Sequence, residues 1–121
     1  MSNKKLIAVL KKPYDLFEVI SSMHSLELNE LVIFCPKNST VLYSKYRAAI
    51  ACNNLKISFH ELDYEADSSV IMESFQKFEP FQIVALPAAH IKIFQNEIFP
   101  QLRKKNKKII GITDGAIHGI G

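Results

Sequence analysis

The residue types that could do chemistry gather where apolar stretches of the chain end. Lys11 and Lys12 follow the first stretch, His90 follows another, and Asp114 follows the last. An Asp carboxylate can take a proton from a substrate hydroxyl that lies within hydrogen-bond reach. A pair of lysines can hold an anionic group. These residues therefore predict a site with a base, a histidine and an anion clamp, provided that the fold brings them together.

Each of these residues also has a simpler interpretation. Asp114 and Gly115 form a dipeptide that is common in turns. His90 can cap the helix expected after it, and Lys11 and Lys12 can be the solvated end of a strand. The sequence leaves both sets of interpretations open.

The elements that must position these residues alternate regularly along the chain. Short apolar runs predict strands, and apolar residues at helical spacing predict helices between them. The strands are expected at 5–10, 31–35, 55–62, 81–86 and 108–112. The helices are expected from Pro13 to about Leu26, from Ser39 or Thr40 to Asn53, from Asp67 or Ser68 to Pro80, and from Ile91 to about Lys105, with Pro100 kinking or dividing the last.

This alternation predicts an α/β fold with a doubly wound parallel sheet of five strands and helices on both faces. The expected strand order is 3-2-1-4-5, a Rossmann-like or flavodoxin-like arrangement. The strand at 55–62 alternates polar with apolar residues, as an edge strand does. In this order a crevice opens between the first and fourth strands. The loops that carry Lys12, His90 and Asp114 should then converge at the carboxyl edge of the sheet.

The bulk composition indicates an ordinary globular domain. The chain has 121 residues, which predicts one domain over 1–121, and its formal net charge is only +3. Cys35 and Cys52 lack the spacing of metal ligands and are expected to be reduced, packed thiols of a cytoplasmic protein. Neither a metal nor a cofactor is expected. No apolar run approaches the length of a bilayer span.

Basic residues are concentrated at the end of the last predicted helix. One interpretation is a solvated helix end, where positive charges interact favourably with the helix dipole. The other is peripheral contact with anionic lipid at the inner membrane surface. The run contains no aromatic residue, so nucleic acid is disfavoured as a partner. The residues concerned are Arg103, Lys104, Lys105, Lys107 and Lys108.

Several common signatures are missing from the sequence. The turn after the first strand reads Lys11-Lys12-Pro13-Tyr14 in place of GxGxxG, which disfavours dinucleotide binding in the usual mode. The chain also lacks GxxxxGK[ST], GxSxG and CxxC. A phosphoacceptor domain would carry acidic residues where this chain has Lys11 and Lys12.

The stretch Ile112-Thr113-Asp114-Gly115 resembles a motif of bacterial GT-B glycosyltransferases of the sialyltransferase or capsule polysialyltransferase type. These families carry two acidic residues and a glycine after a strand of their N-terminal Rossmann-like domain. Asp114 and Gly115 match the motif, and Thr113 replaces the first acid. The resemblance implies that Asp114 is the general base on an acceptor sugar hydroxyl. Lys12, His90, Thr113 and Gly115 are the residues expected to contact the substrate.

The resemblance also implies a missing partner domain. In these families a His-Pro pair on the C-terminal half binds the cytidine nucleotide, and this chain has no His-Pro. The chain is thus expected to be the N-terminal half of a larger two-domain protein. It would bind an oligosaccharide acceptor, would need the other half for its nucleotide-sugar donor, and would be inactive alone. The alternative hypothesis is a non-catalytic Rossmann-like binding or interaction module.

Overall fold

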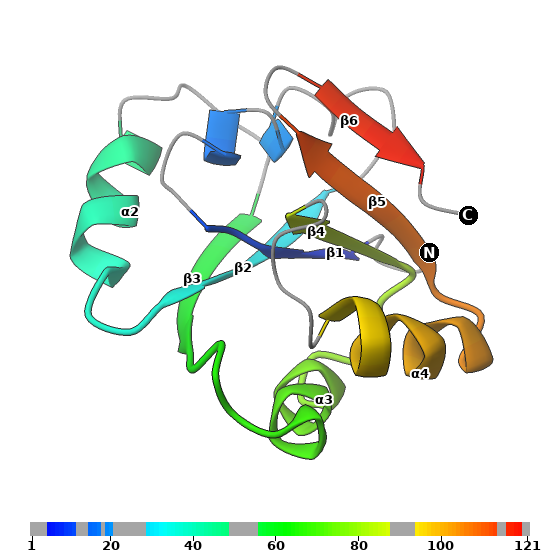
Figure 1. The fold of residues 1–121 in the computed structure, drawn as a ribbon. Coiled ribbons are helices and arrows are strands. Elements are labelled where there is room, and N and C mark those ends of the chain that lie inside the picture. Colours follow the sequence, from blue (N-terminus) through cyan, green and yellow to red (C-terminus); the bar gives the residue numbers. More distant parts are fainter. Residues whose placement is uncertain are drawn as a thin grey trace.

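The computed structural model describes residues 5–11, 15–17, 19–20, 29–48, 56–87, 94–113 and 116–119. One sheet runs through the molecule, with the strand order β3-β2-β1-β4-β5-β6 (Figure 1). Its first five strands are parallel, and their order confirms the predicted 3-2-1-4-5 arrangement. The strands are β1 (Lys5–Val9), β2 (Glu30–Pro36), β3 (Lys56–Leu62), β4 (Ile83–Pro87), β5 (Lys108–Thr113) and β6 (Ala116–Gly119).

Helices cover both faces of this sheet, as the sequence predicts (Figure 1). α3 (Ser68–Gln76), the π-helical segment η1 (Phe94–Ile98) and α4 (Phe99–Lys104) lie on one face. α2 (Thr40–Ala48) and the helical residues 15–17 and 19–20 lie on the other. Because both faces are covered, the central strands β1 and β2 are apolar almost throughout, which is typical of buried parallel strands.

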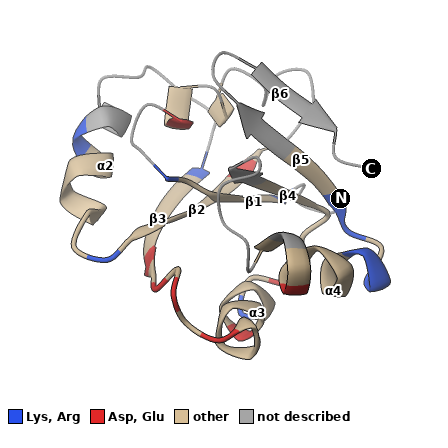
Figure 2. Ribbon diagram, in the orientation of Figure 1, with Lys and Arg blue, Asp and Glu red and all other residues tan. Residues whose placement is uncertain are grey.

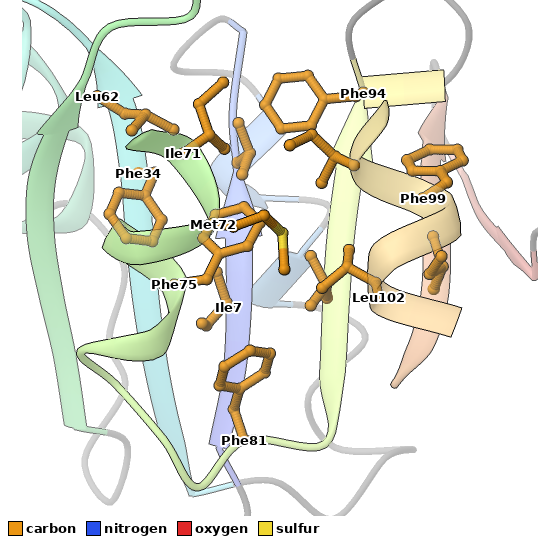
Figure 3. Packing of buried hydrophobic residues seen from close by; sticks show 14 of the residues in the cluster. Ile7, Phe34, Leu62, Ile71, Met72, Phe75, Phe81, Phe94, Phe99 and Leu102 are labelled. Atoms are coloured by element: carbon orange, nitrogen blue, oxygen red, sulfur yellow. The ribbon is translucent and has the colours of Figure 1, made fainter. Parts of the chain in front are cut away.

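The larger of the two cores lies under α3 and α4 (Figure 3). Alternate side chains of the strands, such as Ile7 and Phe34, point to this face and pack against Phe75 of α3 and Leu102 of α4. The ring of Phe34 lies 5.4 Å from that of Phe75, centroid to centroid. The strand side chains that point to the other face of the sheet, such as Leu6 and Leu31, form the second core with Tyr43 of α2.

The edge position of β3 is confirmed, and its side chains are mostly half-buried or exposed. Pro100 divides the last predicted helix, because the π-helical segment η1 ends at Ile98 and α4 begins at Phe99 with the proline in its first turn.

The sequence did not predict β6, which makes the sheet six-stranded. β6 pairs antiparallel with β5, from Thr113↔Ala116 to Ile110↔Gly119. β5 is therefore an inner strand of the sheet. The stretch 116–119 is only four residues long and carries no clear alternation, which is why its periodicity did not reveal a strand.

Candidate functional site

The ends of β1, β4 and β5 share the carboxyl edge of the sheet. Ala8 of β1 is in register with Ala85 of β4, and Pro87 of β4 is in register with Ile112 of β5. β2 and β3 lie on one side of β1, whereas β4 and β5 lie on the other. The strand order therefore reverses between β1 and β4, and ligands of open α/β sheets bind outside the carboxyl ends of the strands at such a reversal.

The residues predicted to act at this edge are only partly described. Lys12, His90, Asp114 and Gly115 lie outside the described residues, so their prediction stands untested. Thr113 is the last residue of β5 and is thus placed at the carboxyl edge, as predicted. Lys11, the second residue after the end of β1, is exposed at the same edge.

The pairing of β5 with β6 bears on the two interpretations of Asp114. Thr113 is opposite Ala116, so the two residues between them connect neighbouring antiparallel strands. Asp-Gly is among the dipeptides that such two-residue connections favour. The turn interpretation is thus supported by the antiparallel pairing of β5 with β6. A catalytic Asp114 would have to act from this connection, and that role remains a prediction.

A half-buried tyrosine, Tyr64, ties the segment just after β1 to β2 at the carboxyl edge. The Tyr64 hydroxyl lies within hydrogen-bond reach of the carbonyl oxygens of Leu10 and of Phe34, the latter at 3.1 Å. The Leu10 N–H donates to the same Phe34 oxygen at 2.9 Å. Burial raises the pKa of Tyr64, so the phenol keeps its proton and remains a donor. This tyrosine therefore serves the fold.

Asp15 fixes the path of the chain as it leaves β1. Its carboxylate is buried, with 8% of the residue exposed, and Oδ2 accepts a hydrogen bond from the Lys11 N–H at 3.2 Å. Asp15 is also the first described helical residue after β1. The contact holds Lys11 at the edge where the sequence places the anion-binding pair.

Cys35 is buried near the end of β2 and is not a reactive thiol. Its Sγ lies 3.4 Å from the carbonyl oxygen of His60. Burial is the main cause that raises the pKa of Cys35, so little thiolate is present near neutral pH. This confirms the prediction of a packed thiol for Cys35, whereas Cys52 lies outside the described residues. Burial raises the pKa of Tyr43 on α2 as well.

A hollow of about 410 Å³ lies beside the edge strand β3, away from the β1–β4 reversal. His60 and Phe78 form part of its wall, with their ring centroids 4.6 Å apart. The His60 Nε2 lies 3.0 Å from Ser58 Oγ, and burial lowers the pKa of His60, which favours the neutral ring at pH 7. His60 belongs to β3, the strand that the sequence predicted at the edge of the sheet.

Sequence reasoning did not single out Asp15 or Tyr64. Asp15 stands next to apolar residues of the helical pattern that the sequence predicts after Pro13, but its burial is visible only in the structure. Tyr64 follows β3 without any pattern, and its role depends on carbonyl groups that are 54 and 30 residues away in the chain.

The described residues contain no group of three His, Cys, Asp or Glu that could hold a metal ion. Within the same part of the chain, no helix has the length and apolar character needed to cross a bilayer. No known protein family, curated protein or solved structure matches the chain. The basis for a functional hypothesis is the carboxyl edge of the sheet, where the strand order reverses between β1 and β4.

Proposed function

We propose that this protein is a Rossmann-like binding domain whose ligand lies at the carboxyl edge of the sheet, between the ends of β1 and β4. The observation that carries the proposal is the reversal of strand order between these two strands. Lys11 is exposed at this edge, and Lys12 and His90 belong to the segments that follow β1 and β4.

The residues at this edge favour an anionic, hydroxyl-rich ligand, such as a sialylated oligosaccharide. Lys11 and Lys12 supply positive charge for a carboxylate, and His90 can donate or accept a hydrogen bond. The segment after β1 lacks the glycines that let a dinucleotide pyrophosphate approach the backbone. The resemblance of residues 112–115 to a sialyltransferase motif supports the same ligand class.

A second candidate function adds catalysis at the same site. Thr113 ends β5 at the carboxyl edge, and Asp114 is the next residue in the sequence. As the acceptor oxygen attacks the anomeric carbon of a nucleotide-activated sugar, Asp114 would take the hydroxyl proton and the nucleotide would leave with the electron pair of the broken bond. A second domain would hold the donor, in the cytoplasm where such donors are made. The chain alone would then bind acceptor without transferring sugar efficiently.

Amide NMR titration tests the binding proposal. Sialylated oligosaccharide should shift the amide signals of Lys11 and Thr113, whereas those of Lys56 and Lys108, at the opposite edge of the sheet, should stay unchanged. Lys11→Gln should weaken binding about tenfold, which corresponds to the loss of one hydrogen bond to a charged group. Lys37→Gln is the matched control, because Lys37 is exposed and paired with Asp63 at 3.4 Å. Shifts centred on the hollow beside β3, or no shifts, would refute the proposal.

Two substitutions of Asp114 separate the catalytic from the turn interpretation. Asn tolerates the same backbone conformations as Asp and keeps a side-chain acceptor, so Asp114→Asn should preserve a turn but remove the base. The test uses the protein joined to a donor-binding domain and measures transfer from a nucleotide-activated sugar. If Asp114 is the base, Asp114→Asn should abolish this transfer and leave the melting temperature unchanged. If Asp114 only forms a turn, Asp114→Asn should be silent and Asp114→Ala should lower the melting temperature.

A further inference from the structure

Basic residues are concentrated in one region of the molecule, where α4 ends and β5 begins (Figure 2). At the amino edge, β1, β3 and β5 each begin with a lysine, and the end of α4 adds further cations next to β5. The described carboxylates at this edge are those of Glu30 and Glu79. Acidic residues gather instead between the end of β3 and the start of α3, where Glu61, Asp63, Glu65 and Asp67 follow one another.

Not all of the cations at the amino edge are available to a partner. Lys107 is bound inside the molecule: Nζ donates to Glu79 Oε1 at 2.7 Å and to the Phe81 carbonyl oxygen at 2.6 Å. Lys5 Nζ donates to the Phe78 carbonyl oxygen at 2.9 Å and lies 3.9 Å from Glu30. The exposed cations where α4 ends and β5 begins are Arg103, Lys104, Lys105 and Lys108, which together are called the basic patch below. Lys107, which the sequence grouped with them, is thus excluded. Lys56 is exposed as well, but it begins β3, at the other end of the sheet from β5.

We propose that the basic patch docks the protein on an anionic lipid bilayer. The patch is formed by the end of one short helix and the start of the next strand, so its four residues are close together in the fold (Figure 2). Clustered cations are attracted to a surface of anionic head groups, and each contributes about fivefold to the partition constant. The cluster carries nearly all of the attraction, because the large apolar residues exposed in the described part of the chain are on α2 and α3.

The surroundings of the basic patch favour a bilayer over nucleic acid. Single strands bind through aromatic rings that stack on the bases. The aromatic residues beside the patch, Phe81 and Phe99, are 2% and 5% exposed and belong to the core. The Arg103 guanidinium lies 5.8 Å from the Phe99 ring centroid, which leaves that ring covered. The patch thus offers positive charge without a stacking surface.

The positions of the basic patch and of the acidic segment also set the orientation on the bilayer. With the amino edge against the head groups, the acidic segment between β3 and α3 is held away from the negative surface (Figure 2). The carboxyl edge then faces the aqueous phase. A ligand at the β1–β4 reversal could be bound while the protein is docked, so docking and ligand binding should be independent.

Sedimentation with vesicles tests this proposal on the whole chain. Vesicles of phosphatidylcholine with 30% phosphatidylserine should bind the protein at about 50 mM salt and release it at about 500 mM, whereas pure phosphatidylcholine should not bind it. Lys104→Gln with Lys105→Gln should lower the partition constant about 30-fold. The matched control is Lys37→Gln with Lys45→Gln, which removes the same charge from exposed lysines elsewhere and should change binding less than twofold.

Three results would overturn the proposal. The first is no binding to the anionic vesicles at low salt. The second is an equal loss of binding in the two double variants, which would mean that net charge rather than the basic patch is responsible. The third is tighter binding to a single-stranded or duplex oligonucleotide than to the vesicles at the same salt. None of these results depends on the oligosaccharide titration, so docking and ligand binding can fail separately.

Discussion

Replacing Lys107 by Met should destabilise the fold, whereas the same change at Lys108 should not. Lys107 joins the start of β5 to the segment before β4 through Glu79, the Phe81 carbonyl oxygen and the Phe81 ring, whose centroid lies 4.0 Å from Nζ. The Lys107 side chain is 10% exposed. Lys108 is the next residue but is exposed, and no ion pair of it is described.

The expected loss follows from the three contacts of Lys107. A hydrogen bond from a charged group to a carbonyl oxygen contributes about 1.5 kcal/mol or more. The contact with the ring adds about 0.5–1 kcal/mol. Glu79 is 39% exposed, so water screens its ion pair, which contributes well under 1 kcal/mol. Met keeps most of the apolar stem, so Lys107→Met should lower the free energy of unfolding by about 2 kcal/mol. For a domain of this size the melting temperature should fall by about 8 °C.

Urea unfolding followed by circular dichroism measures this difference directly, with thermal melts as a second readout. Lys108→Met should stay within about 0.5 kcal/mol of the unmodified protein, as surface substitutions usually do. Binding to anionic vesicles should show the reverse pattern, because Lys108 belongs to the basic patch and Lys107 does not. Equal stability of the two variants would show that the three contacts of Lys107 contribute nothing measurable, and the reasoning would be wrong.

Other predictions concern the carboxyl edge and the titrating groups. Tyr64→Phe should lower the free energy of unfolding by about 1–3 kcal/mol, because the buried Leu10 carbonyl oxygen loses a hydrogen-bond donor. Urea unfolding measures this loss, and a smaller loss would mean that water replaces the hydroxyl. Burial works to raise the pKa of Glu79, but hydrogen bonds from Lys107 and from the backbone, with nearby positive charge, lower it overall. The ionised Glu79 should therefore contribute fully to stability above about pH 4.5, the ordinary pKa of a Glu side chain, and this contribution should be lost as the pH falls below that value. Glu79→Gln should flatten the pH dependence of stability in that range. Cys35 should resist a thiol reagent in the native protein and react on unfolding, as peptide mapping would show; rapid native labelling would contradict its burial.

The strand order could be predicted because it depends on local patterns and general rules. Apolar runs separated by amphipathic stretches indicate parallel strands with crossover helices, and the right-handed crossover then limits the order. The alternation in 55–62 placed that strand at the edge, where the structure has β3. Pro100 marked the division of the last helix for an equally local reason, since proline has no N–H to donate within a helix.

The sixth strand could not be predicted in the same way. A strand of four residues is too short for its periodicity to be informative. What defines it is the pairing of Ile117 with Ile112 on β5, a contact that forms only when the chain turns back on itself. The Asp-Gly pair was recognised as a turn signal, but its identity does not say whether it connects two strands or serves a substrate.

The sequence by itself determined the fold class and the order of the five parallel strands. These follow from spacing and residue type, which act over a few residues at a time. Only the tertiary structure decided which cations are available, because Lys107 and Lys108 are neighbours of the same type and differ in what lies beside them. Glu79 and the Phe81 ring reach Lys107 from 26 to 28 residues away, and the Tyr64 hydroxyl likewise reaches β1 across the fold. Contacts between distant segments depend on packing geometry, and no local pattern carries that information.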